Sequence, residues 1–304
     1  MKDALFFFKR LTKDDINMPS SSNRAAVPWL LAWSGVYALA IAYAKDLDPA
    51  VDNSVIVFFR SMFGFLFLMP SLVKSGLLKT LRPKKPGLML LRSGLMMFAI
   101  WATLRAYRSL DLSVATSIGF TQSIITTTFA GWFLSERVSM KRWIVVGVGY
   151  CGVLFFTDFS SNVQFQMNIL VALGANIAAS LAIIVTKKLT DFEQTMTIIA
   201  VPLFLIMLFT GVVNTINGWK IPSMMILLQI SIIAGAFTFT QYAYVRGLKY
   251  CEASFAAPFE YLKLILAVPI GYLYFHEILS MNKVIGSVII IASNLYLLRN
   301  NNKS

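Results

Sequence analysis

Two opposite charges stand inside an otherwise apolar stretch near the end of the chain. Residues 251–283 read CEASFAAPFEYLKLILAVPIGYLYFHEILSMNK, with Glu260 and Lys263 three positions apart. Three positions bring two side chains to one face of an α-helix. A charge near the middle of a bilayer costs at least ~2.5–3.5 kcal/mol on insertion scales, so it normally faces protein or water. The two charges therefore either recognise a charged or zwitterionic substrate or pair with each other to pack two helices, and Glu260 is also a candidate carrier of a coupling proton.

The helical face that carries these charges is small or polar, whereas the other faces carry Phe, Ile, Leu and Val. Its members, at steps of three or four, are Ala256, Glu260, Lys263, Ala267, Gly271 and Tyr274. Such a face lines a cavity or packs against a neighbouring helix. We predict that Glu260, Lys263 and the adjacent Tyr261 bind substrate.

The same pattern occurs 141 residues earlier, without a gap. The shift pairs Arg105 with Arg246, Ser113 with Ser254, Ala115 with Ala256 and Glu136 with Glu277. It places Gln122 at the position of Lys263, which makes Gln122 a further candidate for substrate binding. The matches indicate an internal duplication, with one copy over residues 27–157 and the other over residues 168–298.

The amino-acid composition indicates which kind of helix must position these residues. The chain has 304 residues, is 57% hydrophobic and 13% charged, and has a mean hydropathy of +0.69. Soluble proteins carry roughly 25% charged residues, and a membrane-spanning helix needs ~20 mostly apolar residues. We therefore expect an all-α polytopic membrane protein with about ten transmembrane helices and no soluble catalytic domain. The expected spans are 27–44, 54–73, 88–106, 112–134, 143–156, 168–186, 195–215, 223–245, most of 251–283, and 283–298.

The net charge of +13 is explained by membrane topology rather than by nucleic-acid binding. With residues 1–26 as a cytoplasmic tail, 19 Lys and Arg residues fall on the inner side and 5 on the outer side. This bias is the positive-inside signature, and it predicts that both termini are cytoplasmic. Five spans in each half make the second copy enter the membrane from the opposite side. Such an inverted repeat is the arrangement that many secondary transporters use for alternating access.

Motifs for catalysis, metal binding and phosphate binding are missing from the sequence. It holds one histidine, His276, and two cysteines, Cys151 and Cys251, in no metal-ligand spacing. There is no H-E-x-x-H, C-x-x-C or G-x-x-x-x-G-K-[ST]. We expect no catalytic residue, no metal, no cofactor and no enzymatic activity.

Four further residues are candidates for the substrate path, each with a structural alternative. Trp33 belongs to an aromatic stripe that either anchors in lipid or lines a cavity. Arg60 either reaches toward the outer surface or contributes to the path. Asn176 hydrogen-bonds either a ligand or a neighbouring helix, and Gln241 is one of the polar residues of the span at 223–245.

Several short motifs resemble those of the EamA-type drug/metabolite transporter superfamily. They are SLDL at 109–112, Ala115 and SER at 135–137, repeated as YCEA at 250–253, AAP at 256–258 and HE at 276–277, together with FFRSMFGFLFLMP at 58–70. The resemblance covers residues 27–298. It implies ten helices in two inverted five-helix repeats, a central cavity, and substrate exchange or export without ATP. The run AAPFEYLKLILAVPIGYLYFHE further resembles a branch that includes bacterial S-adenosylmethionine uptake transporters.

The sequence thus predicts a multi-pass secondary transporter of the bacterial inner membrane that works by alternating access. Its expected substrate is a small polar metabolite, an amino acid or a derivative, with S-adenosylmethionine as one candidate. The expected partners are this small molecule and the lipid bilayer, without nucleic acid, and a homodimer is an open possibility. The alternative function is a non-transporting membrane scaffold or assembly protein. An intramembrane transferase would need a clustered acid and base, which the sequence does not show.

Overall fold

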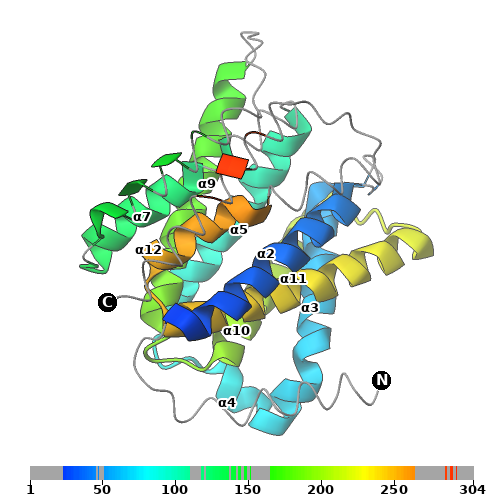
Figure 1. The fold of residues 1–304 in the computed structure, drawn as a ribbon. Helices are drawn as coiled ribbons and strands as arrows, with labels where there is room; N and C mark the ends of the chain where they lie inside the picture. Colours follow the sequence, from blue (N-terminus) through cyan, green and yellow to red (C-terminus); the bar gives the residue numbers. More distant parts are fainter. Residues whose placement is uncertain are drawn as a thin grey trace.

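The computed structural model describes residues 23–45, 47, 51–109, 118–119, 121–136, 138–141 and 165–263, with isolated positions within 143–151 and 285–292. Every element in these residues is a helix (Figure 1). The helices are α2 (Asn23–Lys45), α3 (Asn53–Ser75), α4 (Leu77–Leu81), α5 (Pro86–Ser109), α7 (Thr121–Phe133), α9 (Phe165–Leu189), α10 (Thr195–Asn217), α11 (Met224–Tyr250), α12 (Ala253–Ala256) and the 3-10 helix η1 (Ala257–Tyr261).

Five described segments are long and apolar enough to cross a membrane: Asn53–Ser75, Pro86–Thr103, Leu170–Leu189, Thr195–Asn217 and Met224–Tyr250. They coincide with the spans expected at 54–73, 88–106, 168–186, 195–215 and 223–245. Helices α2 and α7 overlap the expected spans at 27–44 and 112–134. The expected spans at 143–156 and 283–298 lie almost wholly outside the described residues, so the count of ten spans stays a prediction.

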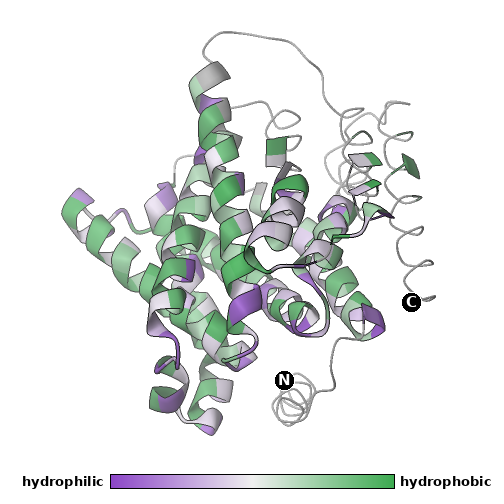
Figure 2. Ribbon diagram, turned by 90° about the vertical axis from the view of Figure 1, so that its left-hand side faces the viewer, coloured by the Kyte–Doolittle hydropathy of each residue, from purple (hydrophilic) through white to green (hydrophobic). Residues whose placement is uncertain are grey.

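The outer surface of the helices is apolar. Large apolar side chains are exposed along several helices, with Val73 at 67%, Val212 at 60% and Leu228 at 58% exposure. Figure 2 shows hydrophobic residues along most of the length of the helices. Exposing such an apolar surface to water is unfavourable, whereas contact with lipid tails is not. The molecule is therefore a multi-pass membrane protein.

Helices of the first predicted copy pack against helices of the second in pairs. α2 lies along α11, α3 along α10, and α5 along α9. Two glycines allow close approach, one between α2 and α11 and one between α3 and α11. A Cβ atom on Gly247 of α11 would lie 2.9 Å from the Leu30 side chain of α2, and one on Gly64 of α3 would lie 2.7 Å from Thr238 Oγ1 of α11. The interior thus lies between residues of the first copy and residues of the second.

The stretch 251–283 differs from the expected single helix where the structure describes it. It begins with one α-helical turn, α12, and continues as the 3-10 helix η1. Pro258 lies at the start of η1 and has no N–H to donate to a preceding carbonyl, which interrupts the α-helical hydrogen bonding there. Residues 264–283, with the rest of the expected polar face, lie outside the described residues.

Arg246 also differs from expectation. The expected span ends at residue 245, just before Arg246, but α11 continues through it to Tyr250, and its side chain is 3% exposed. Its guanidinium carbon lies 5.5 Å from the centre of the Trp29 ring, within cation–π range. This aromatic side chain of α2 is thus one of the contacts of the buried arginine.

Candidate functional site

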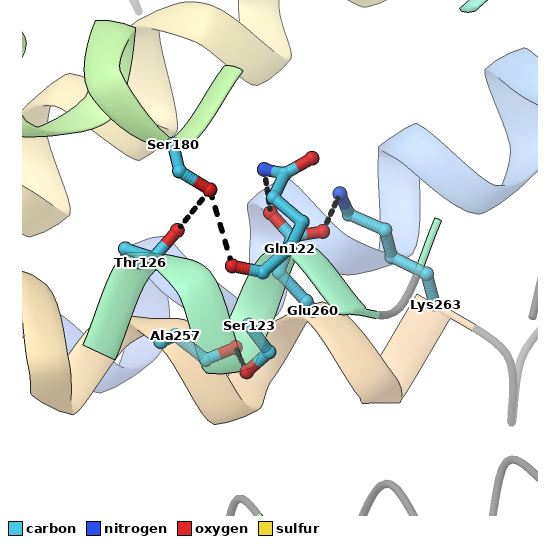
Figure 3. Close-up of polar contacts among 7 residues, drawn as sticks. All are labelled: Gln122, Ser123, Thr126, Ser180, Ala257, Glu260 and Lys263. Atoms are coloured by element: carbon cyan, nitrogen blue, oxygen red, sulfur yellow. Dashed lines mark hydrogen bonds and ion pairs between the residues drawn. The ribbon is translucent and has the colours of Figure 1, made fainter. Parts of the chain in front are cut away.

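Glu260 and Lys263 form an ion pair inside the molecule. Lys263 Nζ donates to Glu260 Oε2, and the two side chains are only 14% and 12% exposed, respectively. Gln122 of α7 donates from Nε2 to Glu260 Oε1 at 3.5 Å, so the carboxylate receives a donor on each oxygen (Figure 3). The sequence-predicted residues Gln122, Glu260 and Lys263 therefore lie together. They join the part of the first copy in α7 to the part of the second copy at η1.

Two aromatic rings of α2 bound the ammonium group of Lys263. Its Nζ lies 4.1 Å from the centre of the Trp33 ring and 3.8 Å from that of Tyr37. Both distances are within cation–π range, and the effect strengthens where water is excluded. Trp33 in turn packs on Tyr244, with ring centres 4.5 Å apart. Trp33 therefore belongs to the same group as the ion pair.

Polar side chains of α7 fix its position against both η1 and α9. Ser123 Oγ donates to the carbonyl of Ala257 at 2.7 Å, and Thr126 Oγ1 donates to Ser180 Oγ at 3.0 Å (Figure 3). Ser180 Oγ also lies 3.2 Å from the carbonyl of Gln122, to which it donates. These contacts, all between buried or partly buried groups, orient the helix that presents Gln122 to Glu260.

A second polar group surrounds Arg92 of α5, which is 2% exposed. Its Nε donates to Thr186 Oγ1 at 2.7 Å and its Nη1 donates to the carbonyl of Ile198 at 2.6 Å. That carbonyl is available because the residue four positions on, Pro202, has no N–H to donate to it. Nη2 lies 3.5 Å from Gln241 Oε1, so the arginine joins α5 to α9, α10 and α11.

Arg92 borders a small cavity between α3, α5, α10 and α11. The cavity holds about 30 Å³, enough for a water-sized group. Its polar side chains are those of Arg60, Ser61, Arg92, Thr238 and Gln241.

Arg60 and the ion pair are connected through aromatic rings. The Arg60 guanidinium carbon lies 4.2 Å from the centre of the Phe237 ring. Phe237 meets Tyr37 edge-on, with ring centres 5.4 Å apart. Because Tyr37 also contacts Lys263, Phe237 and Tyr37 form a continuous bridge between the ion pair and the cavity.

The structure distributes the predicted site residues over three surroundings. Gln122, Glu260, Lys263 and Trp33 form the first group, and Arg60 and Gln241 line the cavity. Asn176 donates from Nδ2 to the Ile118 carbonyl at 2.5 Å and to Thr121 Oγ1 at 3.0 Å, as a contact between helices. Tyr261 is fully buried in packing. In the described part of the chain, no three His, Cys, Asp or Glu side chains gather in a way that would hold a metal ion.

Sequence reasoning missed Arg92, Tyr37 and Phe237 as members of these groups. Arg92 stood near the edge of an expected span, and its partners come from residues 94 to 149 positions away. One signal was available, because a proline inside an apolar span, such as Pro202, exposes a carbonyl that a buried donor can satisfy. The aromatic residues gave no comparable signal.

Comparisons with known proteins agree with this architecture. The EamA-like transporter family matches residues 24–157 and again residues 166–299. The chain is 26% identical over 264 residues to an S-adenosylmethionine uptake transporter of Rickettsia bellii, covering 86% of this chain and 89% of that protein. It is 24% identical over 270 residues to a riboflavin transporter of Vibrio cholerae, covering 87% of this chain and 90% of that protein.

A solved crystal structure shares the fold, with a TM-score of 0.75 at 14% identity. The likeness covers 93% of this chain and 98% of the other. The relatives named above are both transporters by name. Two family matches together span most of the sequence, in agreement with the duplication predicted from the 141-residue shift. The chain belongs to the EamA-like transporter family.

Proposed function

We propose that the protein is a secondary transporter that carries a small polar metabolite across a bacterial inner membrane by alternating access. The polar interior is the observation that carries this proposal. An ion pair, a glutamine and two aromatic rings lie together within an assembly of apolar helices. Charges are costly in such surroundings, and in membrane proteins they typically mark substrate or ion pathways.

The position of this group between the two copies supports alternating access. Gln122 belongs to the copy proposed for residues 27–157, and Glu260 and Lys263 belong to the copy proposed for residues 168–298. Many secondary transporters built from inverted repeats bind substrate between the repeats and rock one against the other. In this proposal the repeats contain five spans each, and both termini are cytoplasmic.

The named relatives suggest which substrates to test first. S-adenosylmethionine and riboflavin are the compounds in the names of the similar proteins from Rickettsia bellii and Vibrio cholerae. An ion pair flanked by aromatic rings suits a polar molecule with both charged and flat parts, because carboxylate, ammonium and ring groups each have a partner there. We propose an amino acid or amino-acid derivative, with S-adenosylmethionine as the leading candidate.

Uptake into proteoliposomes tests the proposal. Full-length protein is reconstituted, and uptake of labelled S-adenosylmethionine, methionine and riboflavin is followed with and without a proton gradient and with unlabelled compound inside. We expect saturable uptake of one compound, accelerated either by the gradient or by internal substrate. Correctly inserted protein that moves none of the compounds in either direction would contradict this substrate assignment and favour the scaffold alternative.

A further inference from the structure

Two arginines indicate a ligand preference that the ion pair does not explain. Arg60 of α3 and Arg92 of α5 line the same cavity. The other polar lining residues, Ser61, Thr238 and Gln241, are uncharged, and no carboxylate lines the cavity among the described residues. Glu260 is the nearest acidic residue along the aromatic bridge, and Lys263 already neutralises it. In the part of the chain that the structure describes, two positive charges therefore border one cavity without a lining counter-charge.

The contacts of both guanidinium groups leave room for an anion. Arg92 donates three described hydrogen bonds, all to neutral oxygens, and a guanidinium group has five N–H donors. The described contact of the Arg60 guanidinium is the face of Phe237. A buried charge is usually paired with an opposite charge or bound to a ligand. Neutral acceptors and a ring face reduce the cost of burying these two arginines but do not neutralise them.

We infer that this cavity binds an anionic group of the transported molecule, a carboxylate or a phosphate, between Arg60 and Arg92. This inference rests on the proposed transport function and narrows its substrate class. Planar guanidinium groups match carboxylate and phosphate oxygens in bidentate geometry. The volume of about 30 Å³ suits a terminal group rather than a whole metabolite.

The aromatic bridge then orients the rest of the molecule. Phe237 and Tyr37 lead from Arg60 to Glu260 and Lys263. An anionic end at the arginines leaves a flat or cationic part along these rings, where cation–π contact and the Glu260 carboxylate provide partners. Amino-acid derivatives have such a charge arrangement, whereas neutral riboflavin has no anionic group.

The experiment compares probes that differ by a single anionic group. Binding to the purified full-length protein in detergent is measured for S-adenosylmethionine against its decarboxylated form, for riboflavin monophosphate against riboflavin, and for inorganic phosphate. We expect the anionic member of at least one pair to bind roughly tenfold or more tightly, the scale of a lost charged hydrogen bond. Arg60→Gln should remove this preference. Equal binding within both pairs, or a preference that survives Arg60→Gln, would overturn the inference, as would no anion binding at all.

A control variant and a phosphate measurement make the result specific. Arg105 also lies beside a ring, 5.6 Å from the centre of Trp101, but it is exposed and does not line the cavity. Arg105→Gln should therefore keep the anion preference. Inorganic phosphate that binds without any effect on binding of the organic probes would indicate a counter-ion site and would overturn recognition of the substrate's own group.

Arg92 needs a variant that separates ligand binding from helix packing. Pro202→Ala restores an N–H that can bond the Ile198 carbonyl, so it replaces one structural partner of Arg92. The double variant Arg92→Gln/Pro202→Ala should be more thermally stable than Arg92→Gln alone and yet lose the anion preference. A folded double variant that keeps the full preference would remove Arg92 from the anion site.

Binding and uptake together separate this inference from the proposed function. Uptake that proceeds equally for carboxylated and decarboxylated S-adenosylmethionine would uphold transport and overturn anion recognition. Anion binding that Arg60→Gln abolishes, without uptake of any compound, would uphold the anion site and overturn transport.

Discussion

The ion pair and the arginine cavity handle charge in opposite ways. Glu260 and Lys263 are three residues apart and neutralise each other within one segment. Arg60 and Arg92 come from different helices, carry the same sign and meet neutral oxygens or a ring. The first group is neutral by itself, whereas in our proposal the second is neutralised only when an anion binds. In a transporter built this way, binding of an anionic substrate group changes the electrostatics of the interior, because it supplies the missing negative charge.

The largest expected effect concerns the ion pair. Glu260→Gln and Lys263→Met should each abolish measurable uptake while the protein stays inserted, because each leaves one buried charge unpaired and removes a proposed substrate contact. Uptake by proteoliposomes is the measurement. The double variant Glu260→Gln/Lys263→Met distinguishes the roles: we expect it to remain inactive, whereas recovered uptake would mean that the two residues only pair.

Arg92 should have the largest effect on stability. Arg92→Met leaves the buried Ile198 carbonyl and Thr186 hydroxyl without this donor, at a cost of about 2–4 kcal/mol. We expect a lower melting temperature in detergent. In the Pro202→Ala background the same substitution should cost less, by about 1 kcal/mol. Equal costs in both backgrounds would contradict the proposed role of the freed carbonyl.

Glu136 allows a smaller test of how the two copies are joined. Its carboxylate accepts the backbone N–H groups of Ala253 at 2.9 Å and Ser254 at 3.1 Å, and the Ser254 hydroxyl at 2.6 Å. Glu136→Gln loses the negative charge at the start of α12 and should lower stability by about 1–2 kcal/mol. Thermal unfolding in detergent measures it. Exposed Asp191→Asn is the matched control, and a loss no larger than in this control would refute the capping role.

The smallest effect is expected at Gln122. Its bond to Glu260 is 3.5 Å long, at the outer limit of a hydrogen bond, and Lys263 still neutralises that carboxylate without it. Gln122→Leu should raise the KM for uptake by roughly threefold, equivalent to less than 1 kcal/mol, with little change in melting temperature. Exposed Gln194→Ala serves as the control. Complete loss of uptake would show that Gln122 contributes far more than this geometry implies.

Features that depend on nearby residues could be predicted from the sequence. Apolar runs located the described spans, and the spacing of Glu260 and Lys263 placed both charges on one side of their segment. The 141-residue shift predicted the duplication, which the two family matches confirm. The sequence pattern did not indicate that a 3-10 helix would replace α-helical turns at Pro258.

The arginine cavity could not be predicted because its contacts are distant in sequence. Arg92 meets Ile198 106 residues away and Gln241 149 residues away. A lone arginine in an apolar run is equally compatible with the surface and the interior until the helices are packed. Arg246 shows the same limit, since a position just beyond the expected span at 223–245 proved buried.

Water access to the interior tests the central claim most directly. Ser61 lines the cavity in the middle part of α3, and Ser61→Cys is placed in a background in which Cys151 and Cys251 are alanine. Lys220→Cys in an exposed segment and Ala200→Cys in the packed core of α10 are the reactive and unreactive controls. We predict that a hydrophilic, membrane-impermeant thiol reagent modifies Ser61→Cys in inserted protein and that S-adenosylmethionine slows the reaction. A Ser61→Cys variant as unreactive as Ala200→Cys under all conditions would mean that no aqueous pathway opens here, and would contradict transport through this interior.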